Sequence, residues 1–296
     1  MTFWTGLLAA LFLLPCAVLA SPAAAAIRFD APAQIGTEAA TLSFPEAGVD
    51  EAGDTSIAWV SNRNGGRMLR FDTVGADGTA GAARTLAAET ELGQMAVAPG
   101  GATTVVGVRW PHPANGGSEI VAARVAADGT VEPLLKLFDK SGWYAEEPHV
   151  AVDPQGDATV VWYSHQLAQV RIEAVQISAA GVVGPILTIS EDGIDPRVAV
   201  DSQGRATVVW NGSGVVGIEH LRIGADGVPG TAGVLPGSGE NSLEPALAVD
   251  SEGRVTVVWR DGPEDDGMVD INRIAADGTV GTTRTLSSEP LGILVD

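Results

Sequence analysis

Four carboxylates share one position in the sequence, directly before a proline that opens an apolar run. These residues are Glu147, Asp195, Glu244 and Glu289. Carboxylates supply the hard oxygen ligands that Ca²⁺ prefers in proteins. If the fold brings the four positions together, we expect them to form a metal site for Ca²⁺. The alternative is a solvated rim of turn residues in a very acidic protein.

A second set of side chains could stack on a ligand. Trp110 and Trp143 lie outside the position at which tryptophan recurs, in segments that we expect to be exposed loops. Tyr163 and His165 begin another stretch of variable length, and such stretches often carry binding residues. Each of these rings has an apolar face and a polar edge. We therefore predict that Trp110, Trp143, Tyr163 and His165 bind a ligand.

Two recurring residue types have a structural explanation. Tryptophan recurs at positions 59, 162, 210 and 259, in register with apolar residues, which favours packing between sheets over stacking on a sugar. Aspartate recurs at positions 50, 153, 201 and 250, each time with glycine three residues later. An aspartate at such a position holds a tight turn through hydrogen bonds to its own backbone.

Other catalytic chemistries lack the residues that they need. The four histidines, at positions 112, 149, 165 and 220, show no spacing typical of zinc ligands. The single cysteine, Cys16, excludes disulfide scaffolds and cysteine-bound metal clusters. The sequence also contains no Gly-x-Ser-x-Gly nucleophile motif and no phosphate-binding loop.

The candidate residues belong to a repeat of about 49 residues. Pro148 to Trp162 recurs as Pro196 to Trp210 and as Pro245 to Trp259, with weaker copies ending at Trp59 and Gly107. Each copy contains an apolar run, an Asp-x-x-Gly turn, a β-branched run, an alternating segment and a hairpin glycine. This pattern predicts four short antiparallel strands per repeat, and repeats of this kind build a β-propeller. The first strands would line the central channel, and the variable loops would share a face with the acidic rim.

We expect five full blades and a composite sixth blade. Residues 27–43 align with the third and fourth strands of the last repeat, and residues 290–296 align with the first strand of a further one. These two segments could share one blade and close the ring. The alternative is that the chain is the front part of a longer protein.

Composition and the N-terminus bear on partners and location. The 296 residues are 45% hydrophobic and carry 17 basic and 37 acidic side chains, a net charge of −20. A chain without a basic face is a poor partner for nucleic acid. Residues 1–26 contain no charged side chain and include an apolar run, which predicts a signal peptide cleaved after Ala20 or Ala26. Arginine outnumbers lysine 15 to 2, which is typical of a GC-rich bacterial genome. We expect bacterial export to the outside or the cell surface, with no membrane insertion after cleavage.

The motif Pro-x-apolar-Ala-Val-Asp-x-x-Gly-x-x-x-Val-Val resembles the NHL-type repeats of secreted and signalling propellers. The resemblance covers residues 27–296, but Trp59, Trp162, Trp210 and Trp259 stand where that family usually has aspartate. It implies a propeller fold and leaves the activity open, because one fold supports many functions. The acidic set resembles in outline the metal centre of gluconolactonase-type propellers.

Three functions remain in consideration. The preferred one is a non-catalytic binding module that recognises a glycan or a protein on the loop face. The second is a Ca²⁺-dependent hydrolase or lactonase with its cation at the channel mouth. The third is a structural propeller segment of a larger surface protein.

Overall fold

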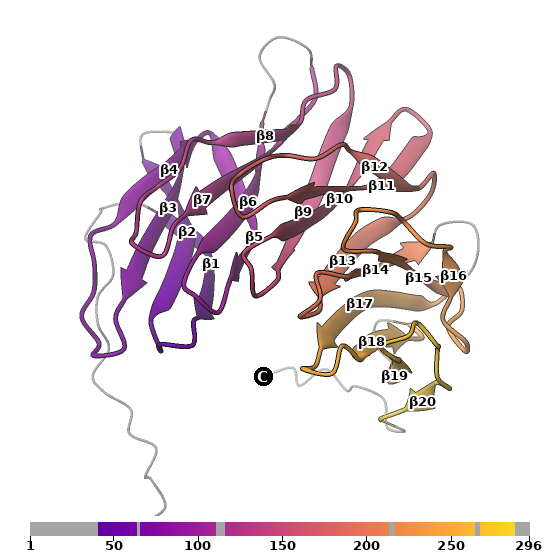
Figure 1. The fold of residues 1–296 in the computed structure, drawn as a ribbon. Coiled ribbons are helices and arrows are strands. Elements are labelled where there is room, and N and C mark those ends of the chain that lie inside the picture. The colour runs from indigo at the N-terminus through magenta and orange to yellow at the C-terminus, as the bar shows by residue number, and fades with distance from the viewer. Residues whose placement is uncertain (1–40, 64–65, 111–115, 213–216, 264–266, 288–296) are drawn as a thin grey trace, which may run out of the picture. The chain divides into compact units, whose positions relative to one another are not determined.

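The computed structural model describes residues 41–63, 66–110, 116–212, 217–263 and 267–287. These residues form five four-stranded antiparallel sheets, here called sheets 1 to 5, which follow one another along the chain (Figure 1). Within each sheet, consecutive strands are neighbours, so every sheet is a simple meander. In the described part of the chain, no helix is long and apolar enough to cross a membrane.

The strand bounds repeat with the period that the sequence predicts. Sheet 1 contains β1 (Thr41–Val49), β2 (Thr55–Arg63), β3 (Gly66–Val74) and β4 (Arg84–Ala88). Sheet 2 contains β5 (Thr90–Val97), β6 (Thr103–Arg109), β7 (Glu119–Val125) and β8 (Leu135–Phe138). Sheet 3 contains β9 (Tyr144–Val152), β10 (Ala158–Gln166), β11 (Gln169–Ile177) and β12 (Leu187–Ser190). Sheet 4 contains β13 (Ile194–Val200), β14 (Ala206–Gly212), β15 (Gly217–Ile223) and β16 (Gly233–Val234). Sheet 5 contains β17 (Ser242–Val249), β18 (Val255–Asp261), β19 (Met268–Ile274) and β20 (Arg284–Thr285).

The turns form as predicted, and the aspartates hold them. In sheet 3, the backbone N–H groups of Gln155 and Asp157 each donate to Asp153 Oδ1 at 2.9 Å. Both bonds recur at Asp201 and Asp250, and at Asp50 the N–H of Asp54 donates to Oδ1. The glycine that follows, such as Gly156 with φ of 88°, lies in the left-handed region that a side chain disfavours. The structural interpretation of the aspartate set is confirmed.

The core lies between consecutive sheets. The recurring residues Trp59, Trp162, Trp210 and Trp259 are all buried, which confirms that they pack inside the protein. Trp162 of sheet 3 contacts Phe138 of sheet 2 at a ring-centroid distance of 5.8 Å. Each of the four hydrophobic clusters combines residues from two neighbouring sheets. Strands with two buried faces, such as β10 and β14, are therefore almost wholly apolar over their central residues.

The first strand of each sheet differs from the prediction. The sequence suggested that this strand opens at the proline, but β9 begins four residues before Pro148, at Tyr144. The proline instead follows a bulge, where the register with the second strand shifts. Glu147, Asp195 and Glu244 stand at these bulges with φ between 48° and 58°. The predicted acidic residues therefore lie within the first strands, not before them.

Several predictions fall wholly or partly outside the described residues. These are the signal peptide at 1–26, Glu289 and most of the composite sixth blade. Thr41–Ser43, which align with the fourth strand of that blade, belong to β1 of sheet 1.

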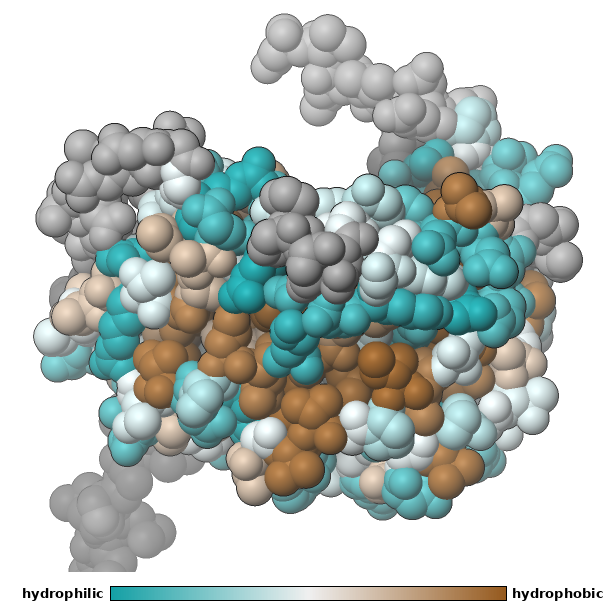
Figure 2. Space-filling model, turned by 90° about the horizontal axis from the view of Figure 1, so that it is seen from above, coloured by the Kyte–Doolittle hydropathy of each residue, from teal (hydrophilic) through white to brown (hydrophobic). Residues whose placement is uncertain are grey.

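The surface carries both hydrophobic and hydrophilic side chains. In Figure 2, hydrophobic residues gather in one region beside a band of hydrophilic ones.

Candidate functional site

A pocket of about 290 Å³ opens between the first strands of sheets 2 and 3. Glu91 and Leu92 of β5 form one side, and Glu146, Glu147 and His149 of β9 form the other. Trp110, which directly follows β6, completes the wall. The first strands of these two sheets, β5 and β9, are in contact, so both sides of the pocket rest on regular strands. A rigid frame of this kind holds binding groups in fixed positions.

A row of four aromatic rings lies beside this pocket. Trp110 stacks on Tyr144 with 5.9 Å between the ring centroids, and Tyr144 stacks on His165 at 5.5 Å. The row ends with Tyr163, whose ring lies 5.9 Å from that of His165. Interplanar angles between 20° and 28° make the rings nearly parallel. We call Trp110, Tyr144, His165 and Tyr163 the aromatic row.

Strand pairing explains how the row forms. In the β9–β10 register, Tyr144 is opposite His165 and Glu146 is opposite Tyr163. Residues two apart on a strand point to the same face, so the side chains of these two pairs lie on one face of sheet 3. The sequence placed Tyr163 and His165 in a loop, but both belong to β10. Tyr144, which is 40% exposed, is the most accessible ring of this strand pair.

Glu146 connects the row through two hydrogen bonds. The Tyr163 hydroxyl donates to Glu146 Oε2 at 2.7 Å, and His165 Nε2 lies 3.1 Å from Glu146 Oε1. Burial raises the pKa of Tyr163 well above its usual value, and the nearby charge of Glu146 raises it further. Tyr163 is therefore a neutral phenol at physiological pH and acts as a hydrogen-bond donor. It is poorly suited to act as a general base.

The predicted acidic set is only partly brought together. Glu147, Asp195 and Glu244 occupy the same bulge position in sheets 3, 4 and 5. Partial burial raises the pKa of Glu147, and the charge of Asp195 raises it further. Partial burial also raises the pKa of Asp195, against the opposing effect of Arg197 and with a smaller contribution from the charge of Glu244. Arg197 forms an ion pair with Asp195 at 2.5 Å, and Arg260 approaches Glu244 at 3.4 Å.

These acidic residues do not form a metal centre in the described part of the chain. No group of three or more His, Cys, Asp or Glu side chains there could hold a metal ion. The fourth predicted ligand, Glu289, lies outside the described residues. The Ca²⁺ site therefore stays a prediction, and the described geometry gives it no support.

His149 lines the pocket as a neutral side chain. Its Nδ1 donates to Gln94 Oε1 at 3.0 Å, and the Val150 N–H donates to the same oxygen at 2.9 Å. Burial lowers the pKa of His149 to about 3, and the charge of Arg197 contributes in the same direction. His149 is thus uncharged at any physiological pH.

The predicted role of Trp143 is corrected by its burial. This residue is only 4% exposed and belongs to the hydrophobic cluster between sheets 2 and 3. Lys140 and Arg171 approach its ring face, at 3.9 Å and 4.8 Å from the centroid. A ring that is covered in this way has no free face for a ligand.

Two residues of the site are not predicted by the sequence. Tyr144 and Glu146 precede the proline at which the repeat pattern predicts that the strand begins. The available signal was the alternation Tyr144-x-Glu146 opposite Tyr163-x-His165. It becomes visible once the strand is extended four residues toward the N-terminus.

No family model matches the chain, and no curated protein does. Among solved structures, a Hadza microbial sialidase matches with a TM-score of 0.55 and 12% identity, over 84% of this chain and 59% of its own. An ulvan lyase of a new polysaccharide lyase family matches with a TM-score of 0.55 and 11% identity, over 83% of this chain and 70% of its own. A protein of unknown function from Dyadobacter fermentans matches with a TM-score of 0.53 and 10% identity, over 83% of each chain.

Identities this low show the fold alone. They confirm the predicted all-β architecture, with five four-stranded antiparallel sheets as propeller blades. The chain spans about 59% of the length of the sialidase. Activity cannot be carried over from proteins this distant, because one fold hosts many functions.

Proposed function

We propose that the protein is a secreted, non-catalytic module that binds a glycan along the aromatic row. One observation carries the proposal: four nearly parallel rings, from Trp110 to Tyr163, adjoin a pocket that is lined by carboxylates. Sugar rings present flat arrays of C–H groups that pack on aromatic faces. Their hydroxyl groups donate hydrogen bonds to carboxylates such as Glu146 and Glu91.

The dimensions suit one sugar unit in the pocket and further units on the row. Small-molecule pockets usually measure roughly 300–1,000 Å³, and the volume of about 290 Å³ lies just below that range. Tyr144 lies between Trp110 and His165 but is 40% exposed, so a neighbouring sugar could contact the part of its side chain that these two rings leave uncovered. Trp110 forms both the wall of the pocket and the start of the row.

The charge of the site favours a neutral or basic glycan. Glu146 and Glu147 line the pocket together with Glu91, whose charge is offset by its ion pair with Arg67, and the protein carries a net charge of −20. An acidic sugar would have to approach several carboxylates of like sign, which raises its free energy of binding. A neutral sugar meets hydrogen-bond acceptors instead.

Two further inferences accompany this proposal. The repeats are of the NHL type, because they share the Pro-x-apolar-Ala-Val-Asp-x-x-Gly motif, and residues 1–26 direct export.

The similarity to a sialidase and to an ulvan lyase solved with a bound saccharide is consistent with a propeller face that binds glycans. Tyr163 as a neutral donor fits binding better than proton abstraction.

A glycan array followed by calorimetry tests the proposal. We expect a neutral or basic oligosaccharide to bind and to be recovered unchanged after prolonged incubation. Tyr144→Ala should weaken binding at least fivefold, which corresponds to about 1 kcal/mol of lost stacking. Val228→Ala, an exposed residue on the hairpin between β15 and β16, should bind as the native protein does.

The contrary outcomes are distinct. If no glycan binds, or if Tyr144→Ala binds as tightly as the native protein, the aromatic row is not a glycan site. If the glycan is cleaved, the module is an enzyme, and the non-catalytic assignment is wrong.

A further inference from the structure

At the opposite ends of the strands from the aromatic row, arginine side chains join consecutive sheets. Arg124 of β7 in sheet 2 extends to the turns of sheet 3. Its guanidinium donates to the carbonyl oxygen of Ser178, to that of Ala179 at 3.0 Å and to that of Gly156 at 3.4 Å. We call the region between two consecutive sheets at these ends a junction.

The same arrangement recurs between sheets 4 and 5. Arg222 of β15 donates to the carbonyl oxygens of Ala276 at 2.6 Å and Ala275 at 3.4 Å. Arg124 and Arg222 hold equivalent positions, because each is opposite a threonine in its sheet, Thr104 and Thr207. Between sheets 1 and 2, Arg84 of β4 supplies the guanidinium and donates to the Gly129 carbonyl oxygen.

The junction between sheets 3 and 4 departs from this pattern. The residue opposite Thr159 is Gln176, so an amide stands where Arg124 and Arg222 stand in their sheets. Sheet 3 also lacks the arginine that follows the turn aspartate in sheets 4 and 5. Arg205 and Arg254 each form a 2.7 Å ion pair with the turn aspartate four residues earlier, but the residue four after Asp153 is Asp157.

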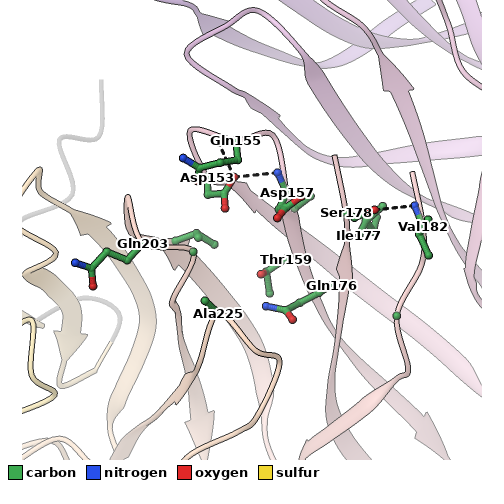
Figure 3. Close-up of a pocket in the computed structure, with 14 residues that line it drawn as sticks. Asp153, Gln155, Asp157, Thr159, Gln176, Ile177, Ser178, Val182, Gln203 and Ala225 are labelled. Atoms are coloured by element: carbon green, nitrogen blue, oxygen red, sulfur yellow. Dashed lines mark hydrogen bonds between the residues drawn. The ribbon is translucent and has the colours of Figure 1, made fainter. Parts of the chain in front are cut away.

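A pocket of about 420 Å³ lies at this junction (Figure 3). Its walls include Gln176 of β11 and Gly204 and Ala225 of sheet 4. By repeat position, Gly204 and Ala225 are equivalent to Gly156 and Ala179, whose carbonyl oxygens accept from Arg124. The corresponding pocket between sheets 1 and 2, where Arg84 is present, measures only about 170 Å³.

The Asp153 carboxylate is aimed across this pocket. Asp153 is only 4% exposed, and its Oδ1 accepts the two turn N–H groups that Figure 3 marks. Its Oδ2 accepts no hydrogen bond from any described residue and lies toward Gly204 of the next sheet, 3.2 Å from where a Cβ would stand. In sheets 4 and 5, the equivalent Oδ2 atoms bind Arg205 and Arg254.

We propose that this pocket binds a guanidinium group of a ligand, which takes the place of the arginine that the other junctions contain. Asp153 Oδ2, the Gln176 amide oxygen and the backbone carbonyl oxygens of sheet 4 are its acceptors. Guanidinium donates several hydrogen bonds in a planar fork, and a carboxylate is its best partner. The second carboxylate, Asp157, adds attraction for a cation. The ligand is either a small guanidino compound or an arginine side chain of a peptide.

Calorimetry and thermal unfolding of the native protein with L-arginine test the proposal. L-citrulline, the uncharged isostere, is the matched control. We expect arginine to bind and to raise the melting temperature, with citrulline binding at least tenfold more weakly. Agmatine and the peptide acetyl-Gly-Arg-Gly-amide separate the two sources of the group, and binding of either supports the proposal. If arginine, agmatine and the peptide have no more effect than citrulline, the proposal is overturned.

Two variants locate the site. Gln176→Arg should supply the guanidinium from within, raise the melting temperature and reduce arginine affinity at least tenfold. Asp157→Asn should keep the hydrogen bond that Asp157 Oδ1 accepts from the Ala179 N–H, yet weaken arginine binding several-fold. Since Asp157→Asn leaves the backbone bond intact, it serves even if Gln176→Arg does not fold. Unchanged arginine affinity in either folded variant would exclude this pocket.

Discussion

The indole nitrogens of the recurring tryptophans differ in their hydrogen bonds. Trp162 Nε1 donates to Glu173 at 3.1 Å, and Trp210 Nε1 donates to Glu219 at 2.6 Å, each across a strand pair. Trp259 faces Asp270 at the equivalent position, but neither Trp259 Nε1 nor Asp270 Oδ1 has a hydrogen-bond partner among the described residues. An aspartate is one methylene shorter than a glutamate, so its carboxylate falls short of the indole.

Asp270→Glu should therefore stabilise the protein. The longer side chain can reach Trp259 Nε1 and satisfy two buried groups, which is worth about 0.5–1.5 kcal/mol. Guanidinium chloride unfolding measures the change as a higher midpoint at constant slope. The reverse substitution, Glu173→Asp, should leave Trp162 Nε1 without its partner and lower stability by about 1–3 kcal/mol. Equal stabilities of native and Asp270→Glu protein would show that the indole is already satisfied by water.

His149 gives the site a pH dependence with a definite sign. The pKa of His149 is about 3 in the folded protein, against an ordinary value of 6.5, because burial disfavours the charged ring. The unfolded chain therefore binds a proton more readily, and His149 lowers stability as the pH falls from about 6.5 toward 3. Above pH 6.5 the ring is neutral in both the folded and the unfolded protein, so His149 no longer lowers stability there.

Removing this histidine should flatten the acid side of the stability profile. We expect the native protein to lose about 1–2 kcal/mol more than His149→Gln between pH 7 and pH 5. Thermal unfolding of both proteins across this range measures the difference. His220→Gln, at a half-buried histidine whose pKa is also lowered by burial, should change the profile in the same direction. Parallel profiles for native and His149→Gln protein would contradict the assignment of a buried neutral ring.

At the scale of the strand, the bulge before the proline recurs in the first strands of sheets 1, 3, 4 and 5. Phe44, Glu147, Asp195 and Glu244 precede Pro45, Pro148, Pro196 and Pro245 with φ between 48° and 58°. An L-residue in this region has a conformational cost of about 1–2 kcal/mol. In sheet 3 the bulge shifts the pairing register, so that Tyr144 is opposite His165 and Glu146 is opposite Tyr163.

Phe44 offers a test of this strain because its side chain is 69% exposed and has little packing to lose. Phe44→Gly should stabilise the protein by about 0.5–1 kcal/mol, since glycine adopts a positive φ without steric cost. Phe44→Ala removes the same ring but keeps the strain, so it should give no gain. Chemical denaturation of the three proteins measures both effects. If the alanine variant gains as much as the glycine variant, the benefit comes from losing the ring.

The bulge also marks the limit of what the sequence could predict. The Asp-x-x-Gly turns and hairpin glycines were predictable because aspartate and glycine prefer those conformations locally. Nothing in a phenylalanine or a glutamate favours a positive φ, so the sequence predicts that the first strand starts at the proline. Tyr144 and Glu146 then lie outside the predicted strand. The burial of Trp143 depends on packing between sheets 2 and 3, which no local pattern reveals.

At the scale of the whole chain, the protein has 17 basic and 37 acidic side chains. In the described part of the chain, each hydrophobic cluster joins two neighbouring sheets, so folding gathers the excess negative charge of the sheets into one compact unit. Self-repulsion of this kind destabilises a compact protein and is screened by salt. The screening length falls from about 30 Å at 0.01 M to about 8 Å at 0.15 M ionic strength.

Raising NaCl from 10 mM to 150 mM at pH 7.5 should therefore raise the melting temperature by a few degrees. Repulsion spread over the molecule is longer in range than the surface ion pairs, such as that of Arg254 with Asp250, and it loses more energy on screening. The same titration near pH 4.4, where the net charge is close to zero, should show little change. A rise of equal size at both pH values would point to a salt effect on hydrophobic burial. A fall at pH 7.5 would mean that the ion pairs outweigh the repulsion, so that the acidic surface is stabilised by its few arginines.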